Sequence, residues 1–357
     1  MIFDDFYRGK RVFITGMSGF KGSWLYLTLK QLGAKVLGYS LPPEHQSFMT
    51  LIQKSEISPS EYFYSDIGNY ETLQTRMQKF EPDIVIHLAA QAIVLKSYQN
   101  PMDTYKTNVQ GTVNVLEACR HTPSVKLILN ITTDKVYLNE NQNKEFEESD
   151  KLCGLDPYSN SKSCSELVSY SYYQSFFKEA GVSLITLRAG NVIGGGDFAE
   201  NRIVPDCARA LMKDEPIVLR HPNYTRPFQH VLDVILSYLF VGYKMYGSNT
   251  FDSFNIGPQK ALSVEQIAVR FCKTWGGGLI NKLNKNDAPA EAQTLMLSTQ
   301  KISQELNWHS LYTPEDAIKL SAQWYKYFYE SSDSKSIIEY SKSQISEAIE
   351  KGIKLWQ

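Results

Sequence analysis

The sequence is poor in cysteine and has almost no net charge, and both shortages exclude classes of protein. Its five cysteines, Cys119, Cys153, Cys164, Cys207 and Cys272, are odd in number and widely spaced, without a CxxC pair. Neither a disulfide framework nor a zinc site is expected, so no metal is predicted, and a reducing cytoplasmic setting fits best. The net charge of −1 lacks the basic excess of a nucleic-acid surface, so no nucleic acid is expected as a partner.

Long apolar runs are also missing. No stretch of about 18 apolar residues occurs, so no membrane span is predicted. The first residues, MIFDDFYRGK, lack the apolar run of a signal peptide. Internal repeats and low-complexity tracts are absent as well. A chain of 357 residues, at roughly 150 residues per domain, indicates about two domains with a core of their own.

Short apolar runs alternate with helical patterns over the first half of the chain. Strands are predicted at 11–16, 34–40, about 62–66, 83–90, 126–132 and 183–192. Helices are predicted at 22–33, 71–80, 103–120 and from 157 to about 178. Continuous apolar strands separated by helices indicate a parallel sheet covered on both faces. The predicted fold class is therefore α/β with a doubly wound sheet.

The alternation stops after about residue 192, where glycines and prolines interrupt the pattern. FDSFNIG (251–257) reads as a strand that returns to the sheet. We predict a sheet domain over 1–192, completed by 251–257, and a smaller C-terminal domain over 193–330. A polar tail over 331–357 has a short helical pattern and is expected to pack on the protein or to contact another subunit.

A glycine-rich segment, TGMSGFKG (15–22), lies between the first strand and the first helix. In GxxGxxG spacing the first glycine allows a tight turn, the second lets the backbone approach a pyrophosphate, and the third lets the helix pack on the sheet. The helix start also offers N–H groups and partial positive charge to phosphates. The segment predicts a dinucleotide site, with a purely structural turn as the alternative. The predicted contacts are Gly16, Ser18, Gly19, Phe20 and Gly22.

The acidic residue that usually holds the ribose 2′-OH, about 20 residues further on, is missing. The second strand runs into Tyr39-Ser40-Leu41-Pro42-Pro43, which has neither an acid nor an arginine for a 2′-phosphate. NAD is favoured and NADP stays open. Asp66 and Ile67 follow the third strand, where a carboxylate and an apolar side chain can bind an adenine. A helix N-cap is the alternative role for Asp66.

The long helix opens with DPYSNSK (156–162). Tyr158 and Lys162 are four residues apart, so they lie on one helical face, about 6 Å apart. Moving a tyrosine pKa from about 10 to about 7 takes roughly 4 kcal/mol, and a neighbouring ammonium with the cationic nicotinamide ring acts in that direction. Such a tyrosine can remove a hydroxyl proton while hydride leaves the same carbon. A surface helix pair is the alternative.

The fifth strand ends in NITTDKVY (130–137), at the sheet edge where ligands bind in this architecture. Thr133 can hydrogen-bond to a substrate oxygen. Asp134 and Lys135 place an acid and a base side by side. Turn chemistry or an exposed ion pair is the alternative.

Together these motifs resemble the extended short-chain dehydrogenase/reductase family, whose nucleotide-binding domain has the Rossmann fold. TGMSGFKG, HLAAQ, NVQGT, TTDKVY and YSNSK occur in the family's order. A closer resemblance, from about residue 6 to about residue 345, is to the CDP-glucose 4,6-dehydratases. It is carried by GFKGSWL (19–25), TTDKVY (132–137), DPYSNSK (156–162), RAGNVIGGGDF (188–198), RIVPD (202–206) and RPFQHV (226–231). The resemblance implies tightly bound NAD, a substrate-binding role for the smaller domain, and a homodimer formed through helices.

The resemblance also implies roles for single residues. Tyr158 would take the proton of the sugar 4-OH, supported by Lys162 and Thr133, while hydride passes from C4 to the nicotinamide. Water is then lost across C5 and C6, and the hydride returns to C6. Asp134 matches the aspartate that protonates the departing 6-OH. Lys135 stands where the dTDP-glucose enzymes have glutamate, as it does in the CDP-glucose branch, and the group that takes the C5 proton stays open.

Other contacts follow from the resemblance by position. The expected cofactor contacts are Ala89, Ala90, Gln91 and Asn108, and the expected substrate contacts are Ser97, Asn191, Arg202 and Arg226. A guanidinium matches the geometry of a phosphate. The alternatives are a dehydratase or epimerase of a GDP-, UDP- or dTDP-linked sugar, and an inactive NAD-binding regulator. The Asp134-Lys135 pair favours elimination over epimerisation, and intact Thr133, Tyr158 and Lys162 argue against a regulator.

Overall fold

The computed structural model describes residues 5–141, 144–283, 295–331 and 333–356. Its central sheet has seven parallel strands in the order β12–β7–β5–β4–β1–β2–β3. The doubly wound sheet predicted from the sequence is confirmed. The strands are β1 (Arg11–Thr15), β2 (Lys35–Ser40), β3 (Tyr62–Tyr64), β4 (Ile84–His87), β5 (Leu127–Ile131), β7 (Ser183–Ala189) and β12 (Phe251–Ile256).

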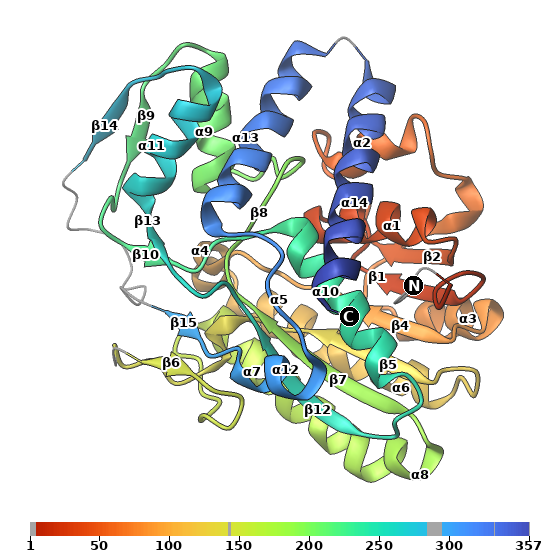
Figure 1. Ribbon diagram of the computed structural model, residues 1–357. Helices are drawn as coiled ribbons and strands as arrows, with labels where there is room; N and C mark the ends of the chain where they lie inside the picture. The colour runs from red at the N-terminus through yellow and green to blue at the C-terminus, as the bar shows by residue number, and fades with distance from the viewer. Residues whose placement is uncertain (1–4, 142–143, 284–294, 332, 357) are drawn as a thin grey trace.

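These strands are mostly buried because both faces of the sheet are covered (Figure 1). Successive side chains of a strand point to opposite faces. Along β1, Val12 and Ile14 join the core on one face, whereas Phe13 joins the core on the other. The first face carries α1 (Phe20–Gln31) and α10 (Val231–Met245), and the second carries α3 (Tyr70–Phe80), α6 (Gly111–Arg120) and α7 (Pro157–Tyr172).

Both long helices of the second face contain a π-helical turn. The segment predicted as one helix over 103–120 consists of α5 (Pro101–Tyr105), the π-helical η2 (Lys106–Gln110) and α6. Likewise, α7 continues through the π-helical η4 (Tyr173–Phe177) into α8 (Lys178–Ala180). Such turns inside a helix are frequent at functional sites, and η2 carries Asn108.

A smaller group of elements follows the carboxyl end of β7 and lies at the upper left of Figure 1. It consists of β8 (Val192–Ile193), α9 (Ile203–Met212), β9 (Ile217–Leu219), β10 (Thr225–Arg226), β11 (Gln229–His230), β13 (Leu262–Ser263), α11 (Val264–Trp275) and β14 (Ile280–Lys282). The remaining short elements are η1 (Pro59–Glu61), α4 (Val94–Gln99), η3 (Asp134–Val136), β6 (Glu145–Phe146), β15 (Met296–Leu297) and α12 (Gln300–Leu306).

The last helices pack back onto the sheet domain. The tail forms a helix of 22 residues, α14 (Ser334–Leu355), which contacts α1, α2 (Phe48–Gln53) and α13 (Pro314–Glu330). Trp324 Nε1 donates to Ser341 Oγ at 2.9 Å, and Lys342 pairs with Glu56 at 2.8 Å. The tail is therefore an internal packing arm. No helix within the described ranges has both the length and the apolar character needed to cross a membrane.

A buried ion pair fastens α7 to the sheet. Arg188, on β7, donates to both carboxylate oxygens of Glu166, at 3.0 and 2.9 Å. The hydroxyls of Thr132 and Thr186 donate to the same carboxylate at 2.5 and 2.6 Å. Burial alone would raise the pKa of Glu166, but Arg188 and the two hydroxyls hold that pKa below its ordinary value. Arg188 also donates to the Tyr137 hydroxyl at 2.8 Å, which joins η3 to the same network.

Candidate active site

The strand order reverses between β1 and β4, and in such sheets ligands bind where the carboxyl ends of these two strands part. Gly16 follows β1 directly at this point and has a φ of 72°. A Cβ added to it would lie 2.7 Å from the backbone nitrogen of Ala89. At Gly22, an added Cβ would lie 2.3 Å from the carbonyl oxygen of Gly16. Both positions require glycine because protein backbone fills the space beside them.

Gly19, the middle glycine of the loop, has a different reason to be small. An added Cβ at Gly19 would have only the Gly16 carbonyl oxygen nearby, at an ordinary 3.5 Å. Helix α1 begins there without a side-chain cap and without an acidic residue in its first turn. Helix N–H groups without a protein partner attract anions. The open, uncapped start of α1 therefore fits the diphosphate of a dinucleotide.

The segment after β2 lies beside this turn, and the segment after β3 is bonded to the end of β2 through the Tyr39 hydroxyl, which donates to the Asp66 carbonyl oxygen at 3.1 Å. Ser18 Oγ donates to the carbonyl oxygen of Leu41 at 2.8 Å, which ties the glycine loop to the segment after β2. Asp66 is exposed and accepts from the backbone N–H two residues further on, at 2.6 Å. The helix α3 is capped by Asn69, so the N-cap role considered for Asp66 is wrong. Ile67 is buried against α6.

Gln91 and Asn108 hold the segment after β4 against α7. Asn108 accepts from the backbone N–H of Gln91 at 2.8 Å and donates to its carbonyl oxygen at 3.0 Å and to Ser161 Oγ at 2.9 Å. The side chain of Gln91 donates to Thr104 at 2.9 Å and accepts from the N–H of Ile93 at 2.7 Å. The polar atoms of both side chains are thus used inside the protein, where they position this part of the sheet edge.

Thr133, Asp134 and Lys135 lie at the carboxyl end of β5, and Tyr158 lies in the first turn of α7. Asp134 Oδ1 accepts from the Thr133 hydroxyl at 3.0 Å and from Lys135 Nζ at 3.1 Å. Asp134 is fully buried, and its Oδ2 has no partner in the described part of the chain. Burial raises the pKa of Tyr158, whereas Lys135 and Thr133 act to lower it. The structure therefore brings these four predicted residues together, with the phenol among polar groups.

Lys162 lies one turn further along α7. Its Nζ donates to the carbonyl oxygen of Ile131, the last residue of β5, at 2.9 Å. Burial lowers the pKa of Lys162 to about 8, and the carboxylate of Glu166 opposes this shift. Helical spacing predicted this amine beside the phenol. In the structure, the positive charges that lower the pKa of Tyr158 come from Lys135 and Arg202.

Lys21 is a further cation of the site that the sequence analysis passed over. It lies half-buried in the first turn of α1 and donates to the Tyr238 hydroxyl at 3.3 Å. Burial lowers the pKa of Lys21 to about 7, helped by the charges of Lys162 and Arg202 and opposed by Asp134. A lysine at a helix N-terminus opposes the helix dipole. This unfavourable position of Lys21 within GFKG is the signal in the sequence that could have identified the residue.

The four predicted substrate residues have different surroundings. Arg202 pairs with Asp197 at 2.8 Å, and its positive charge acts to lower the pKa of Tyr158. Asn191 follows β7, and its Oδ1 is buried without a partner among the described residues. Arg226 is buried and donates to the preceding carbonyl oxygen at 2.9 Å. Ser97 is fully buried and donates to the carbonyl oxygen of Val94 at 2.7 Å, so its hydroxyl proton is engaged within α4.

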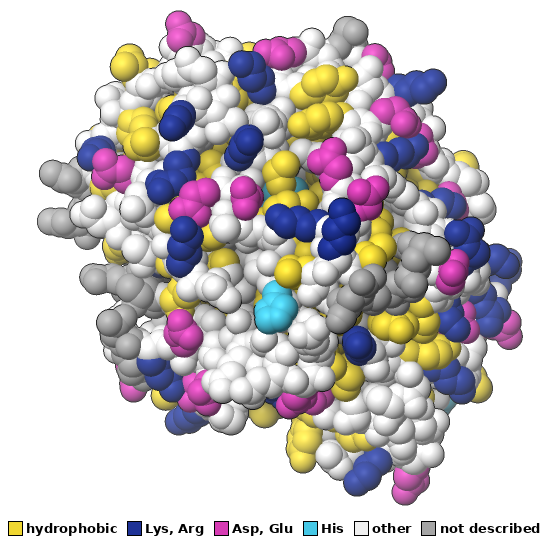
Figure 2. Space-filling view, in the orientation of Figure 1, with side chains coloured by type: hydrophobic (Ala, Val, Ile, Leu, Met, Phe, Trp, Pro, Cys, Tyr) yellow, Lys and Arg dark blue, Asp and Glu magenta, His cyan; other side chains and the backbone are white. Residues whose placement is uncertain are grey.

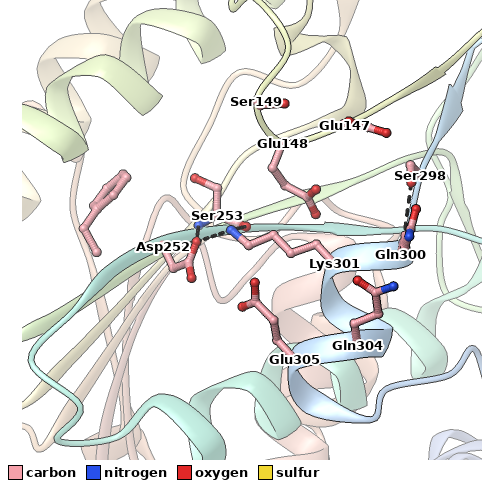
Figure 3. A pocket seen from close by; sticks show the side chains of 11 residues that line it. Glu147, Glu148, Ser149, Asp252, Ser253, Ser298, Gln300, Lys301, Gln304 and Glu305 are labelled. Atoms are coloured by element: carbon pink, nitrogen blue, oxygen red, sulfur yellow. Dashed lines mark hydrogen bonds and ion pairs between the residues drawn. The ribbon is translucent and has the colours of Figure 1, made fainter.

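A separate polar pocket lies at the outer edge of the sheet, between β12 and α12 (Figure 3). Lys301 pairs there with Asp252 and donates to the Ser253 carbonyl oxygen at 3.1 Å, and Glu148 and Glu305 line the same space. Its described lining includes none of the predicted site residues.

Figure 2 shows positive and negative side chains interspersed over the visible face. Within the described ranges, no three His, Cys, Asp or Glu side chains gather to hold a metal ion.

Comparison with known proteins extends this picture. The family model for GDP-mannose 4,6 dehydratase matches residues 13–320. CDP-glucose 4,6-dehydratase of Salmonella typhimurium is 39% identical over 336 residues, which cover 91% of this chain and 93% of that protein. dTDP-D-glucose 4,6-dehydratase of Homo sapiens is 25% identical over 331 residues, covering 89% of this chain and 90% of that protein. The crystal structure of dTDP-glucose 4,6-dehydratase from Bacillus anthracis, in complex with NAD, shares the fold with a TM-score of 0.76 at 20% identity, over 90% of this chain and 98% of that one.

The substitution Gly19→Ala is expected to leave the fold intact and to weaken dinucleotide binding, because its methyl enters the open space beside the uncapped start of α1. Affinity for NAD should fall about tenfold or more, at least ~1.4 kcal/mol, measured by calorimetric titration. The ligand-free melting temperature should stay within about 2 °C of the parent. In the matched control Gly22→Ala, the methyl would meet the Gly16 carbonyl oxygen, so the ligand-free melting temperature should fall. Unchanged NAD affinity in Gly19→Ala would contradict the assignment.

Proposed function

The chain belongs to the GDP-mannose 4,6-dehydratase family, and on that premise we propose that it is a carbon–oxygen lyase, a 4,6-dehydratase of CDP-glucose with tightly bound NAD. The observation that carries the proposal is the cluster of Asp134, Lys135 and Tyr158 around Thr133. An acid and an amine beside the tyrosine suit the loss of water, which an epimerisation does not include. Identity of 39% to the Salmonella typhimurium enzyme supports CDP-glucose as the substrate.

Each residue of the cluster has a defined task in this reaction. When bound, NAD would accept a hydride from C4 of the sugar and return it to C6. Tyr158 removes the proton of the 4-OH, and the Thr133 hydroxyl holds the same oxygen. Because burial raises the pKa of Tyr158, the positive charges of Lys135 and Arg202 are needed to make its phenolate accessible. Asp134 donates a proton to the departing 6-OH through Oδ2, the oxygen that no described residue engages.

The remaining predicted contacts complete the site. We assign Lys162 to the nicotinamide side of the site, with its amine held by the carbonyl oxygen of Ile131 at the end of β5. Arg202 and Arg226 are assigned to the diphosphate of the substrate and Asn191 to its sugar, while Ser97 is a substrate contact by resemblance alone. We assign substrate binding to residues 193–330, beside the nucleotide-binding domain of residues 1–192 with 251–257.

We also propose a cytoplasmic homodimer. The helices α5 and α7 lie side by side, with the Tyr105 hydroxyl donating to Asn160 Oδ1 at 2.9 Å. Their outer surface exposes apolar side chains: Met102 is 84% exposed, Leu167 56% and Tyr170 51%. Such a patch on neighbouring helices suits a subunit interface.

Five free cysteine thiols suit a reducing compartment. The 4-keto-6-deoxy product would serve deoxysugar synthesis, for example for the O-antigen of lipopolysaccharide.

Purified enzyme supplied with CDP-glucose should form a 4-keto product, followed by its absorbance in alkali. The same assay with dTDP-, UDP- and GDP-glucose should give rates at least about tenfold lower, a discrimination of ~1.4 kcal/mol or more. Tyr158→Phe serves as the inactive control, and it should still bind NAD. Turnover of a different nucleotide sugar alone would reject CDP-glucose, and no turnover of any of the four would favour a regulator.

Asp134→Asn is expected to slow the loss of water more than the oxidation at C4, because the amide cannot donate the proton of a carboxylic acid. Loss of a general acid costs about 10²–10⁴ in rate. In D₂O, mass spectrometry should show deuterium entering C5 of recovered CDP-glucose while the 6-OH is retained. Asp252→Asn, in the outer pocket of Figure 3, is the matched control and should turn over normally. Normal product formation by Asp134→Asn would contradict the role.

The double substitution Met102→Asp with Leu167→Asp places two charges on the proposed interface. It should convert the dimer to a monomer in sedimentation velocity, since charge is unfavourable in the apolar core of an interface. Lys319→Asp on α13, away from this surface, is the control. A parent protein that sediments as a monomer, or a variant that remains a dimer, would exclude this surface.

A further inference from the structure

Ser40 is the last residue of β2, between the glycine loop and the end of β3. On one side, the backbone N–H of Gly16 donates to the carbonyl oxygen of Tyr39 at 2.9 Å. On the other side, the backbone N–H of Ser65 donates to the carbonyl oxygen of Ser40, also at 2.9 Å. In dinucleotide-binding sheets of this kind, a carboxylate about 20 residues after the glycine loop holds the ribose 2′-OH. Ser40 occupies this place, and its side chain has no charge.

The hydroxyl of Ser40 is buried and unpaired. The residue is 5% exposed, and its Oγ has no hydrogen-bond partner among the described residues. A buried hydroxyl without a partner is unfavourable, and buried polar side-chain atoms are generally hydrogen-bonded. The neighbouring Ser18 differs, because its hydroxyl is already engaged with the carbonyl oxygen of Leu41. The unpaired atom therefore points to a ligand group that Ser40 meets.

The segment after Ser40 has no group suited to a second phosphate. It continues as Leu41, Pro42 and Pro43, without an acid to repel a 2′-phosphate and without a cation to bind one. The bond from Ser18 to Leu41 holds this neutral segment against the glycine loop. A single neutral hydroxyl can exchange hydrogen bonds with another hydroxyl, but it cannot neutralise a dianion.

We infer that Ser40 binds the 2′-OH of the adenosine ribose of the cofactor through its side-chain hydroxyl, in place of the usual carboxylate. The inference rests on the proposed use of NAD and assigns one residue to its recognition. Removal of either hydroxyl, from the protein or from the ribose, should then have the same effect on binding. Removal of both should cost no more than removal of one.

The test is a double-mutant cycle that compares the parent and Ser40→Ala, each as the full-length enzyme stripped of bound nucleotide. Calorimetric titration measures the affinity of each protein for NAD and for the analogue that lacks the adenosine 2′-OH. The parent should bind NAD about five- to tenfold more tightly than the 2′-deoxy analogue, as expected for one hydrogen bond. Ser40→Ala should bind both nucleotides within about twofold of each other, and NAD should bind to it about as weakly as the analogue binds to the parent.

A structural measurement separates ligand recognition from support of the fold. Because the Ser40 hydroxyl has no partner to lose, the ligand-free melting temperature of Ser40→Ala should equal or exceed that of the parent. Ser183→Ala is the matched control, since its buried hydroxyl accepts from the N–H of Asn249 at 3.0 Å at the opposite end of the sheet. This control should melt at a lower temperature and keep the parent's preference for NAD.

Two results would overturn the inference. One is a Ser40→Ala enzyme that prefers NAD over the analogue as strongly as the parent does. The other is a Ser40→Ala enzyme that melts early, like Ser183→Ala, and binds both nucleotides more weakly by the same factor. A parent that binds neither nucleotide would overturn both the proposed cofactor and this inference. A parent that prefers NAD but does not convert CDP-glucose would leave the inference standing while the substrate assignment fails.

Discussion

The carboxylate of Glu166 joins α7 to the sheet, and the geometry of the whole site depends on this contact. Glu166 lies on the same face of α7 as Lys162 and one turn beyond it, and it accepts from Thr132, the residue before Thr133. It is also held by Arg188 on β7. Removing one partner of such a buried pair leaves an uncompensated charge, at a cost of about 3–5 kcal/mol. The same pair thus fixes the helix that carries the phenol and the two strand ends that face it.

Positive charge accumulates around the buried carboxyl group of Asp134. Lys21, Lys135, Lys162 and Arg202 all surround Asp134 or act on its neighbours. Partial desolvation lowers the pKa of Lys21 to about 7 and that of Lys162 to about 8, which means that their charged forms are poorly stabilised by the protein alone. A diphosphate-bearing substrate and a dinucleotide both bring negative charge to this region. We therefore expect the site to favour polyanionic ligands, because the opposite charges stabilise each other.

Unpaired polar atoms mark the carboxyl edge of the sheet. Ser40 Oγ ends β2, Asp134 Oδ2 follows β5 and Asn191 Oδ1 follows β7, and none of the three has a partner among the described residues. By contrast, the side chains of Gln91 and Asn108 at the same edge are fully engaged with the protein. On the proposed function, the edge consists of residues that shape it and residues whose hydrogen bonds are available to ligands. This separation keeps the reactive groups in place before a ligand binds.

The sequence by itself determined the doubly wound sheet, the glycine loop at 15–22 and the grouping of Thr133, Asp134 and Lys135, because these depend on periodicity and on neighbours along the chain. The π turn at η2 interrupts the helix predicted over 103–120, and Asn69 caps α3 through a bond from the Thr72 N–H, in the place considered for Asp66. Only the tertiary structure decided which charges surround the phenol. Arg202 comes from a distant segment, and helical spacing alone suggested Lys162, whose amine is held by the end of β5. Electrostatic surroundings are set by distance in space, and no pattern along the chain encodes that distance.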